Sequence, residues 1–307
     1  MPDGAGMSGL CNWSRRTTGV KYARVVKPPS GASRRKRTPA GGELVHAKVG
    51  GRSIFYRTAG RGPTLLLLHG FLCDSRCWRS QLAALSDRFT VVAWDAPGAG
   101  MSPDPAEHFT IADWADTLDE FLYAIGVVRA HVLGLSWGGM LAQELFRLHP
   151  ARINHLILAD TYAGWRGSLP ADTVEQRRAR CYRDAGRPTR EVVAEWVPAD
   201  FFLEASPELA AEMAAVVADF HPLGFRLMAR SLADTDTTPV LKTINVPTLL
   251  LWGEGDRRSP LSVAEQFHAA IPGSELRVIP GAGHVSNMEK REDFNSHVRR
   301  FLLGSAN

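Results

Sequence analysis

Cysteine is scarce in this chain, and long apolar runs are absent from it. Its 307 residues contain four cysteines: Cys11, Cys73, Cys77 and Cys181. This number excludes the dense disulfide framework of small secreted proteins, and Cys73 and Cys77 have no second close pair of Cys or His to complete a metal site. Aliphatic runs such as residues 65–68 are far shorter than the ~20 residues of a membrane-spanning helix. The sequence therefore predicts reduced thiols, a cytoplasmic location, and no membrane span, metal or cofactor.

Excess positive charge is missing from the body of the chain. The formal net charge is +4, but residues 1–43 hold nine Lys and Arg against Asp3 and Glu43, a net of +7, which leaves −3 for the remainder. Nucleic-acid binding by the body is therefore not expected, because it needs clustered Lys and Arg there. Residues 1–43 also offer few apolar side chains to bury, which predicts a disordered basic N-terminal extension. A targeting segment or a start assigned too far upstream are the alternatives.

From residue 43 onward, strand-like runs alternate with helical patterns. This alternation predicts an α/β fold, with a mostly parallel twisted sheet and helices on both faces. Ligands bind such sheets where the carboxyl ends of the strands meet their loops. The expected strands are 43–49, 53–57, 64–68, 89–94, 130–133, 153–159, 247–252 and 276–279, and the expected helices are 78–85, 111–125, 138–148 and 262–271.

One long interval, residues 162–243, contains helical stretches and prolines but no strand-like run. An insertion of this size before the penultimate strand predicts a helical cap over the active edge of the sheet. The expected organisation is an extension (1–43), the first part of the core (44–161), the cap (162–243) and the second part of the core (244–307).

A serine lies between glycines at the junction of a predicted strand and a predicted helix. The segment Gly134-Leu-Ser136-Trp-Gly138 fits the pattern G-x-S-x-G. In a nucleophile elbow this pattern places the serine on a strained turn, where small neighbours avoid clashes. The helix that follows offers unpaired N–H groups and a positive dipole end to a developing oxyanion. The pattern therefore predicts that Ser136 is a nucleophile.

A serine nucleophile needs a base that is itself oriented by an acid. Asp256 follows the strand predicted at 247–252, and His284 follows the last one. Both strand ends lie at the same edge of the sheet as Ser136, and the order Ser, Asp, His is that of one known type of catalytic triad. Glu254 and Asp160 also follow strands and stay open as alternative acids.

The remaining site residues follow from the same topology. Two backbone N–H groups, those of Phe71 and Trp137, are expected to form the oxyanion hole. For the apolar candidates, packing is the alternative role. The candidates for the substrate pocket are Leu72, Trp165, Phe201, Phe225 and Val285.

Several motifs resemble a known family. His69-Gly70 and the D-x-x-G-x-G-x-S loop at 95–102 are similar to markers of the α/β-hydrolase superfamily, which the chain resembles over residues 45–303. Within it, the chain looks most similar to 3-oxoadipate enol-lactonase-like hydrolases, on the stretches GLSWGGMLAQELFRLHP, LILADT, IPGSELRVIPGAGH and SNMEKREDFN. The resemblance implies Ser136 as nucleophile, Asp256 as orienting acid and His284 as base.

Missing motifs narrow the reaction. The elbow holds Ser136 and not the nucleophilic Asp of dehalogenases and epoxide hydrolases, and the HGGG run of lipases and esterases is absent. HGFLC stands where proline iminopeptidases have HGGPG. No Trp follows His284 closely, as it usually does in the hydrolases that cleave carbon–carbon bonds of ring-fission products. The sequence predicts a serine hydrolase acting on a small carboxylic ester or lactone through an acyl-enzyme intermediate. The alternatives are a cofactor-free perhydrolase or haloperoxidase-like enzyme, an aminopeptidase-like hydrolase, or a non-catalytic small-molecule receptor on the same fold. The sequence predicts no oligomeric state.

Overall fold

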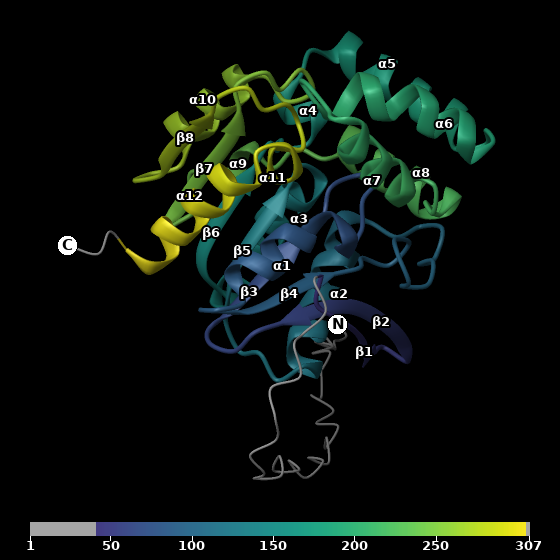
Figure 1. Cartoon of the computed structure of the whole chain (residues 1–307). Helices are drawn as coiled ribbons and strands as arrows, with labels where there is room; N and C mark the ends of the chain where they lie inside the picture. Colours follow the sequence, from purple (N-terminus) through teal and green to yellow (C-terminus); the bar gives the residue numbers. More distant parts are fainter. Residues whose placement is uncertain (1–40, 305–307) are drawn as a thin grey trace, which may run out of the picture. The chain divides into compact units, whose positions relative to one another are not determined.

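An eight-stranded sheet lies at the centre of the computed structural model, which describes residues 41–304 (Figure 1). Its strands are β1 (Glu43–Val49), β2 (Arg52–Ala59), β3 (Thr64–Leu68), β4 (Thr90–Trp94), β5 (Ala130–Leu135), β6 (Ile153–Ala159), β7 (Thr248–Gly253) and β8 (Glu275–Ile279). They lie in the order β1-β2-β4-β3-β5-β6-β7-β8. Every neighbouring pair from β4 to β8 is parallel, whereas β2 is antiparallel to β1 and to β4. The predicted mostly parallel sheet is confirmed.

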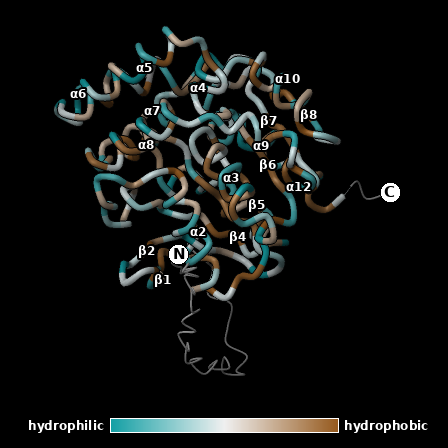
Figure 2. Tube along the Cα trace, turned by 180° about the vertical axis from the view of Figure 1, so that it is seen from behind, coloured by the Kyte–Doolittle hydropathy of each residue, from teal (hydrophilic) through white to brown (hydrophobic). Residues whose placement is uncertain are grey.

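The central strands are buried along almost their whole length. Every residue of β5 and of β7 is buried, and in β3 and β4 only the first residue keeps partial exposure. Parallel strands covered on both faces read as continuous apolar runs for this reason. In Figure 2 hydrophobic segments gather around the central strands β4, β5 and β6, whereas the outer helix α5 (Ala171–Asp184) is largely hydrophilic.

The first two strands form the predicted hairpin. Gly50 and Gly51 make the turn between them, with φ angles of 52° and 81°. Two successive residues at positive φ match the right-handed twist of the strands, and glycine adopts them without strain.

Helices pack against the sheet from both sides. The helix α1 (Arg79–Leu85) packs on α12 (Arg291–Leu303), and α2 (Ile111–Ala124) packs on α3 (Trp137–Leu148). A capping box at Thr110 and Asp113 begins α2 and satisfies free N–H groups of its first turn. The other helical segments described before β6 and after β7 are η1 (Ser75–Trp78), η2 (Pro150–Arg152), α10 (Leu261–Ala270) and α11 (Ser286–Glu289).

A group of helices between β6 and β7 lies at one end of the sheet (Figure 1). We call this group the cap helices. They comprise α4 (Trp165–Ser168), α5, α6 (Thr189–Trp196), the π-helical turn η3 (Val197–Phe201), α7 (Pro207–Val217), α8 (Pro222–Asp234) and α9 (Thr238–Leu241). The Trp137 indole N–H donates to Ser231 Oγ of α8 at 2.9 Å, and the Val285 N–H donates to the Phe201 carbonyl at 3.0 Å. The cap helices therefore contact the segments that follow β5 and β8.

Two further sequence predictions concern the N-terminal extension and the absence of a membrane span. The predicted extension 1–43 lies outside the described residues except for its last three, and Glu43 already begins β1. Within residues 41–304, no helix combines the length and the apolar character that a membrane crossing requires.

Candidate active site

The backbone at Ser136 is strained and held from a neighbouring strand. Ser136 joins β5 to α3 with φ 53° and ψ −116°, a conformation that residues with a side chain seldom adopt. Its N–H donates to the Ala159 carbonyl at 2.9 Å, and its carbonyl accepts from Thr161 Oγ1 at 2.5 Å. Both partners belong to β6 or the loop after it, so the sheet itself fixes the turn.

The glycines around Ser136 are required by close backbone packing. A Cβ at Gly134 would lie 2.3 Å from the Gly138 carbonyl oxygen, and one at Gly138 would lie 2.2 Å from the Leu68 carbonyl oxygen. A Cβ at Gly139 would lie 2.3 Å from Thr161 Oγ1. The sequence pattern thus matches a junction at which β3, β5 and α3 approach one another too closely for any side chain.

Ser136, His284 and Asp256 form one chain of hydrogen bonds. His284 Nε2 lies 2.9 Å from Ser136 Oγ, and His284 Nδ1 lies 2.8 Å from Asp256 Oδ2. An ionised carboxylate accepts hydrogen bonds and does not donate them, so Nδ1 carries the proton and Nε2 accepts from the serine hydroxyl. Ser136 is 5% exposed and His284 4% exposed, and the Asp256 side chain is fully buried. Burial strengthens these bonds because little water competes for the groups.

The two alternative acids make other contacts. Glu254 Oε2 accepts from the Gly281 N–H at 3.1 Å. Asp160 Oδ1 accepts from the Gly253 N–H at 2.8 Å, and its Oδ2 accepts from Ser286 Oγ at 2.5 Å. Burial raises the pKa of Asp160 well above its ordinary value, and the nearby Asp256 carboxylate adds to this rise. Asp160 therefore joins β7 to the segment after His284 without contacting the imidazole.

The turn at 69–71 passes directly beside the serine. A Cβ at Gly70 would lie 3.4 Å from the Ser136 Cβ, so the residue before Phe71 packs against the serine side chain. Trp137 is the first residue of α3, so its N–H has no acceptor inside the helix. His69 fixes the turn: its Nδ1–H donates to the Gly70 carbonyl at 2.8 Å, and its Nε2 accepts from the Ala96 N–H at 3.2 Å. Burial lowers the pKa of His69, which keeps its ring neutral for this paired role.

The five pocket candidates fall into three places. Leu72 and Phe225 line one small cavity together with residues of the loop at 98–100, and the Phe225 ring lies 4.7 Å from the Phe71 ring. Phe201 and Val285 meet through their backbones at the His284 loop. Trp165 is fully buried on α4, where the Arg177 guanidinium lies 5.7 Å from its ring.

Two contacts at the site were not predicted from the sequence. The Asp256 Oδ1 accepts from the N–H groups of Arg258 and Ser259 at 2.8 and 2.9 Å. The Glu289 carboxylate accepts from the Gly283 N–H, directly before His284, at 2.6 Å. Arg258, Ser259 and Glu289 each lie within six residues of a predicted site residue, but no sequence pattern distinguishes them from ordinary surface residues. Among residues 41–304, no group of His, Cys, Asp or Glu has an arrangement that could hold a metal ion.

Comparisons with known proteins point in one direction. The family model described as alpha/beta hydrolase fold matches residues 63–291. The proposed carbamate hydrolase RutD from Shigella flexneri is 29% identical over 246 residues, which cover 76% of this chain and 89% of that protein. The 3-oxoadipate enol-lactonase 2 from Acinetobacter baylyi is 27% identical over 253 residues, covering 81% and 93%. A thermophilic esterase from Thermogutta terrifontis has a solved structure with a TM-score of 0.77 and 28% identity, covering 85% of this chain and 98% of that one.

Proposed function

Because the chain belongs to the alpha/beta hydrolase fold family, we propose that it is a serine hydrolase that cleaves a small carboxylic ester or lactone. The single observation that carries the proposal is the hydrogen-bonded series Ser136, His284 and Asp256. Its members come from three separate loops after β5, β7 and β8. A purely structural role would not explain a strained, slightly exposed serine that donates to a histidine.

The proposed reaction proceeds in two halves. His284 Nε2 takes the Ser136 proton while Oγ attacks the carbonyl carbon, and the N–H groups of Phe71 and Trp137 bind the resulting oxyanion. The imidazolium then protonates the leaving oxygen, which breaks the ester bond and leaves an acyl-enzyme. In the second half, His284 Nε2 takes a proton from water, whose oxygen attacks the acyl carbon. The bond to Ser136 Oγ then breaks, the imidazolium returns the proton to Oγ, and the acid is released. Asp256 holds the Nδ1–H tautomer and stabilises the charged ring throughout.

The cap helices are proposed to close over this site and to select the substrate. The low exposure of Ser136 and His284 supports this proposal, because a buried site excludes bulk water during the reaction. The relatives include an enol-lactonase and an esterase, which favours ester and lactone carbonyls. The relative proposed as a carbamate hydrolase makes carbamates the first comparison in any substrate screen.

The test is a substitution of the nucleophile. Ser136→Ala is expected to lower kcat for p-nitrophenyl acetate and butyrate by at least about 10³-fold, while the melting temperature stays within a few degrees. A fluorophosphonate probe should label the wild-type protein at Ser136 and leave the variant unlabelled. Screening p-nitrophenyl esters beside small lactones and aryl carbamates would rank the three carbonyl classes.

Two outcomes would overturn the proposal. Near-normal esterase activity in the folded Ser136→Ala variant would remove Ser136 from the chemistry. A wild-type protein that takes no label and hydrolyses none of the three carbonyl classes would favour the non-catalytic receptor.

A further inference from the structure

The Glu289 carboxylate joins the loop that carries His284 to the cap helices. Its Oε1 accepts from the N–H groups of Leu203 and Glu204 at 3.0 and 2.7 Å. Its Oε2 accepts from the Gly283 N–H at 2.6 Å. Three backbone donors on one carboxylate form charge-assisted hydrogen bonds, which are roughly twice as strong as neutral ones. Glu289 therefore holds two chain segments that are about eighty residues apart in the sequence.

The segment 201–204, which we call the cap segment, lies directly on the loops of the proposed acid and base. The Val285 N–H donates to the Phe201 carbonyl at 3.0 Å. A Cβ at Gly283 would lie 2.5 Å from the Leu203 nitrogen, and one at Gly255 would lie 2.7 Å from the Leu203 Cδ2. Gly255 precedes Asp256, and Gly283 precedes His284. The cap segment thus contacts the chain beside both residues.

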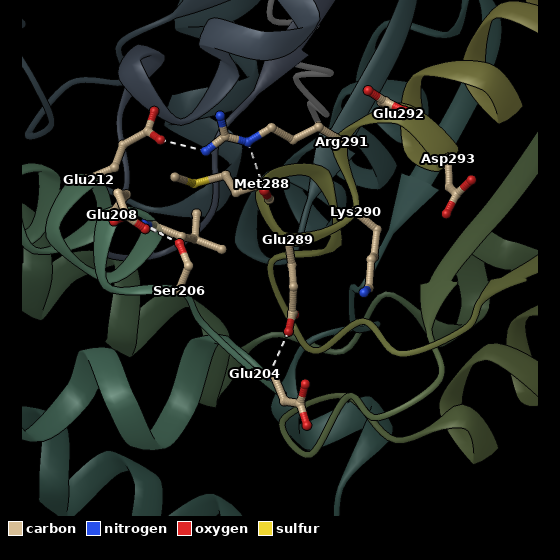
Figure 3. A pocket seen from close by; sticks show the side chains of 11 residues that line it. Glu204, Ser206, Glu208, Glu212, Met288, Glu289, Lys290, Arg291, Glu292 and Asp293 are labelled. Carbon is tan, nitrogen blue, oxygen red and sulfur yellow. Dashed lines mark hydrogen bonds and ion pairs between the residues drawn. The ribbon is translucent and has the colours of Figure 1, made fainter.

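Glu289 is reached from solvent through a pocket between α7 and the start of α12. In Figure 3 its side chain extends from α11 toward Glu204, with the hydrogen bond between them drawn as a dashed line. An ion pair crosses the same pocket, where the Arg291 guanidinium lies 2.5 Å from the Glu212 carboxylate. That ion pair joins α7 to α12 but contacts neither the cap segment nor Gly283. The pocket therefore contains two cap-to-core contacts of different kinds.

We propose that Glu289 is a positioning residue that couples the seating of the cap segment to the alignment of His284; this inference rests on the proposed serine-hydrolase function. If the cap segment moves away, Glu289 loses two of its three donors, and the Val285 N–H loses the Phe201 carbonyl. Gly283 and Val285 flank His284 on both sides. Cap opening thus releases the backbone that aims the imidazole at Ser136, and cap closure restores it.

Glu289→Gln tests this coupling with almost no change in shape. The amide oxygen can still accept from Leu203 and Glu204, but the amide NH₂ then faces the Gly283 N–H, and two donors oppose each other. We expect kcat for p-nitrophenyl butyrate to fall at least about tenfold, because a small misplacement of a catalytic group is costly. KM should change less than about threefold. The rate of Ser136 labelling by a fluorophosphonate should fall in parallel with kcat.

Two further variants make the result specific. Glu212→Gln removes the ion pair with Arg291 in the same pocket and should leave kcat and KM within about twofold of the wild-type values. Gly283→Ala approaches the junction from the other side, since the added methyl group meets the Leu203 nitrogen. It should lower kcat in the same way. Melting temperatures show that each variant is folded at the assay temperature.

The outcomes separate this inference from the proposed function. If Glu289→Gln is folded but keeps kcat within twofold, or raises KM alone, Glu289 holds the cap without positioning His284 and the inference is wrong. If the wild-type protein itself takes no fluorophosphonate label, the serine-hydrolase function fails instead. A fall in kcat and labelling rate for Glu289→Gln and Gly283→Ala, but not for Glu212→Gln, supports the coupling.

Discussion

Asp256 and Asp160 are two buried carboxylates whose surroundings assign them different partners. The Oδ1 of Asp256 is occupied by two backbone N–H groups, which leaves Oδ2 directed at His284. Asp160 follows β6 and has a strained φ of 45°. Its Oδ1 accepts from the Gly253 N–H, and its Oδ2 accepts from Ser286 Oγ. Its raised pKa favours the neutral acid, which can also donate a hydrogen bond. At the scale of single residues, the environment distinguishes the proposed orienting acid, Asp256, from Asp160, which binds only the neighbouring loops.

This difference predicts opposite results for two matched substitutions. Asp256→Asn should lower kcat by about 10³–10⁴-fold, because an amide at this position can donate to Nδ1 and so favours the wrong imidazole tautomer. Asp160→Asn should lower kcat by less than about tenfold, since an amide resembles the neutral acid in size and hydrogen bonding. Steady-state kinetics on p-nitrophenyl butyrate measures both. The assignment of the acid is wrong if Asp160→Asn proves to be the more damaging change.

Two histidines face each other between neighbouring strands. His131 on β5 pairs in register with His155 on β6, and their Nδ1 atoms lie 3.1 Å apart. One neutral ring must donate and the other accept, so protonation of the acceptor would place two N–H groups against each other. Burial lowers the pKa of His131 to about 4, and the neighbouring His155 contributes. Burial also lowers the pKa of His155.

The β5–β6 pair therefore predicts a loss of stability in mild acid. Between the ordinary histidine pKa of about 6.5 and the folded value of about 4, the unfolded chain binds more protons than the folded one. The contribution of His131 to stability is complete above pH 6.5 and is lost as the pH falls toward 4. Because the histidine pair keeps partial access to solvent, we expect the free energy of unfolding to fall by only roughly 1–2 kcal/mol between pH 6.5 and pH 5.

Urea unfolding at pH 7.5 and at pH 5 measures this effect. The His131→Gln variant serves as the comparison, because its side chain does not titrate. It should lose less stability between the two pH values than the wild-type protein does. Equal losses in both proteins would show that the histidine pair has no part in acid sensitivity.

Across the whole molecule, short sequence patterns predicted the features that depend on nearby residues, and they did not predict contacts between distant loops. The apolar runs of β3, β5 and β7 and the glycines around Ser136 each reflect packing within a few residues or at one sheet edge, so a single sequence reveals them. The contacts of Glu289 and Asp160 depend on which loops meet after folding, and their neighbours in sequence carry no sign of this. The same holds for Leu72 and Phe225, whose shared cavity is made by segments far apart in the chain.

Buried charge contributes to the attachment of the cap helices to the core. The Arg258 guanidinium lies 3.0 Å from Asp200 Oδ1 of η3, and Arg180 of α5 lies 2.8 Å from Asp200 Oδ2. Both arginines also lie against the Trp196 ring, at 5.3 and 4.1 Å from its centre. Arg258 is two residues from Asp256, so this cluster connects the loop of the proposed acid to the cap helices.

The cluster predicts an asymmetric response to the loss of either charge. Arg258→Met leaves Asp200 paired with Arg180, so no carboxylate is left unpaired, and the free energy of unfolding should fall by at most about 1–2 kcal/mol. Asp200→Asn removes the carboxylate from two arginines, and the Arg258 side chain is only 10% exposed. An unpaired charge of this kind costs about 3–5 kcal/mol when it is buried. Urea unfolding of the two variants should therefore rank Asp200→Asn as clearly the less stable. The reverse order, or equal stabilities, would mean that Asp200 is neutralised mainly by Arg258 or by water, and that the cap helices depend on their apolar contacts instead.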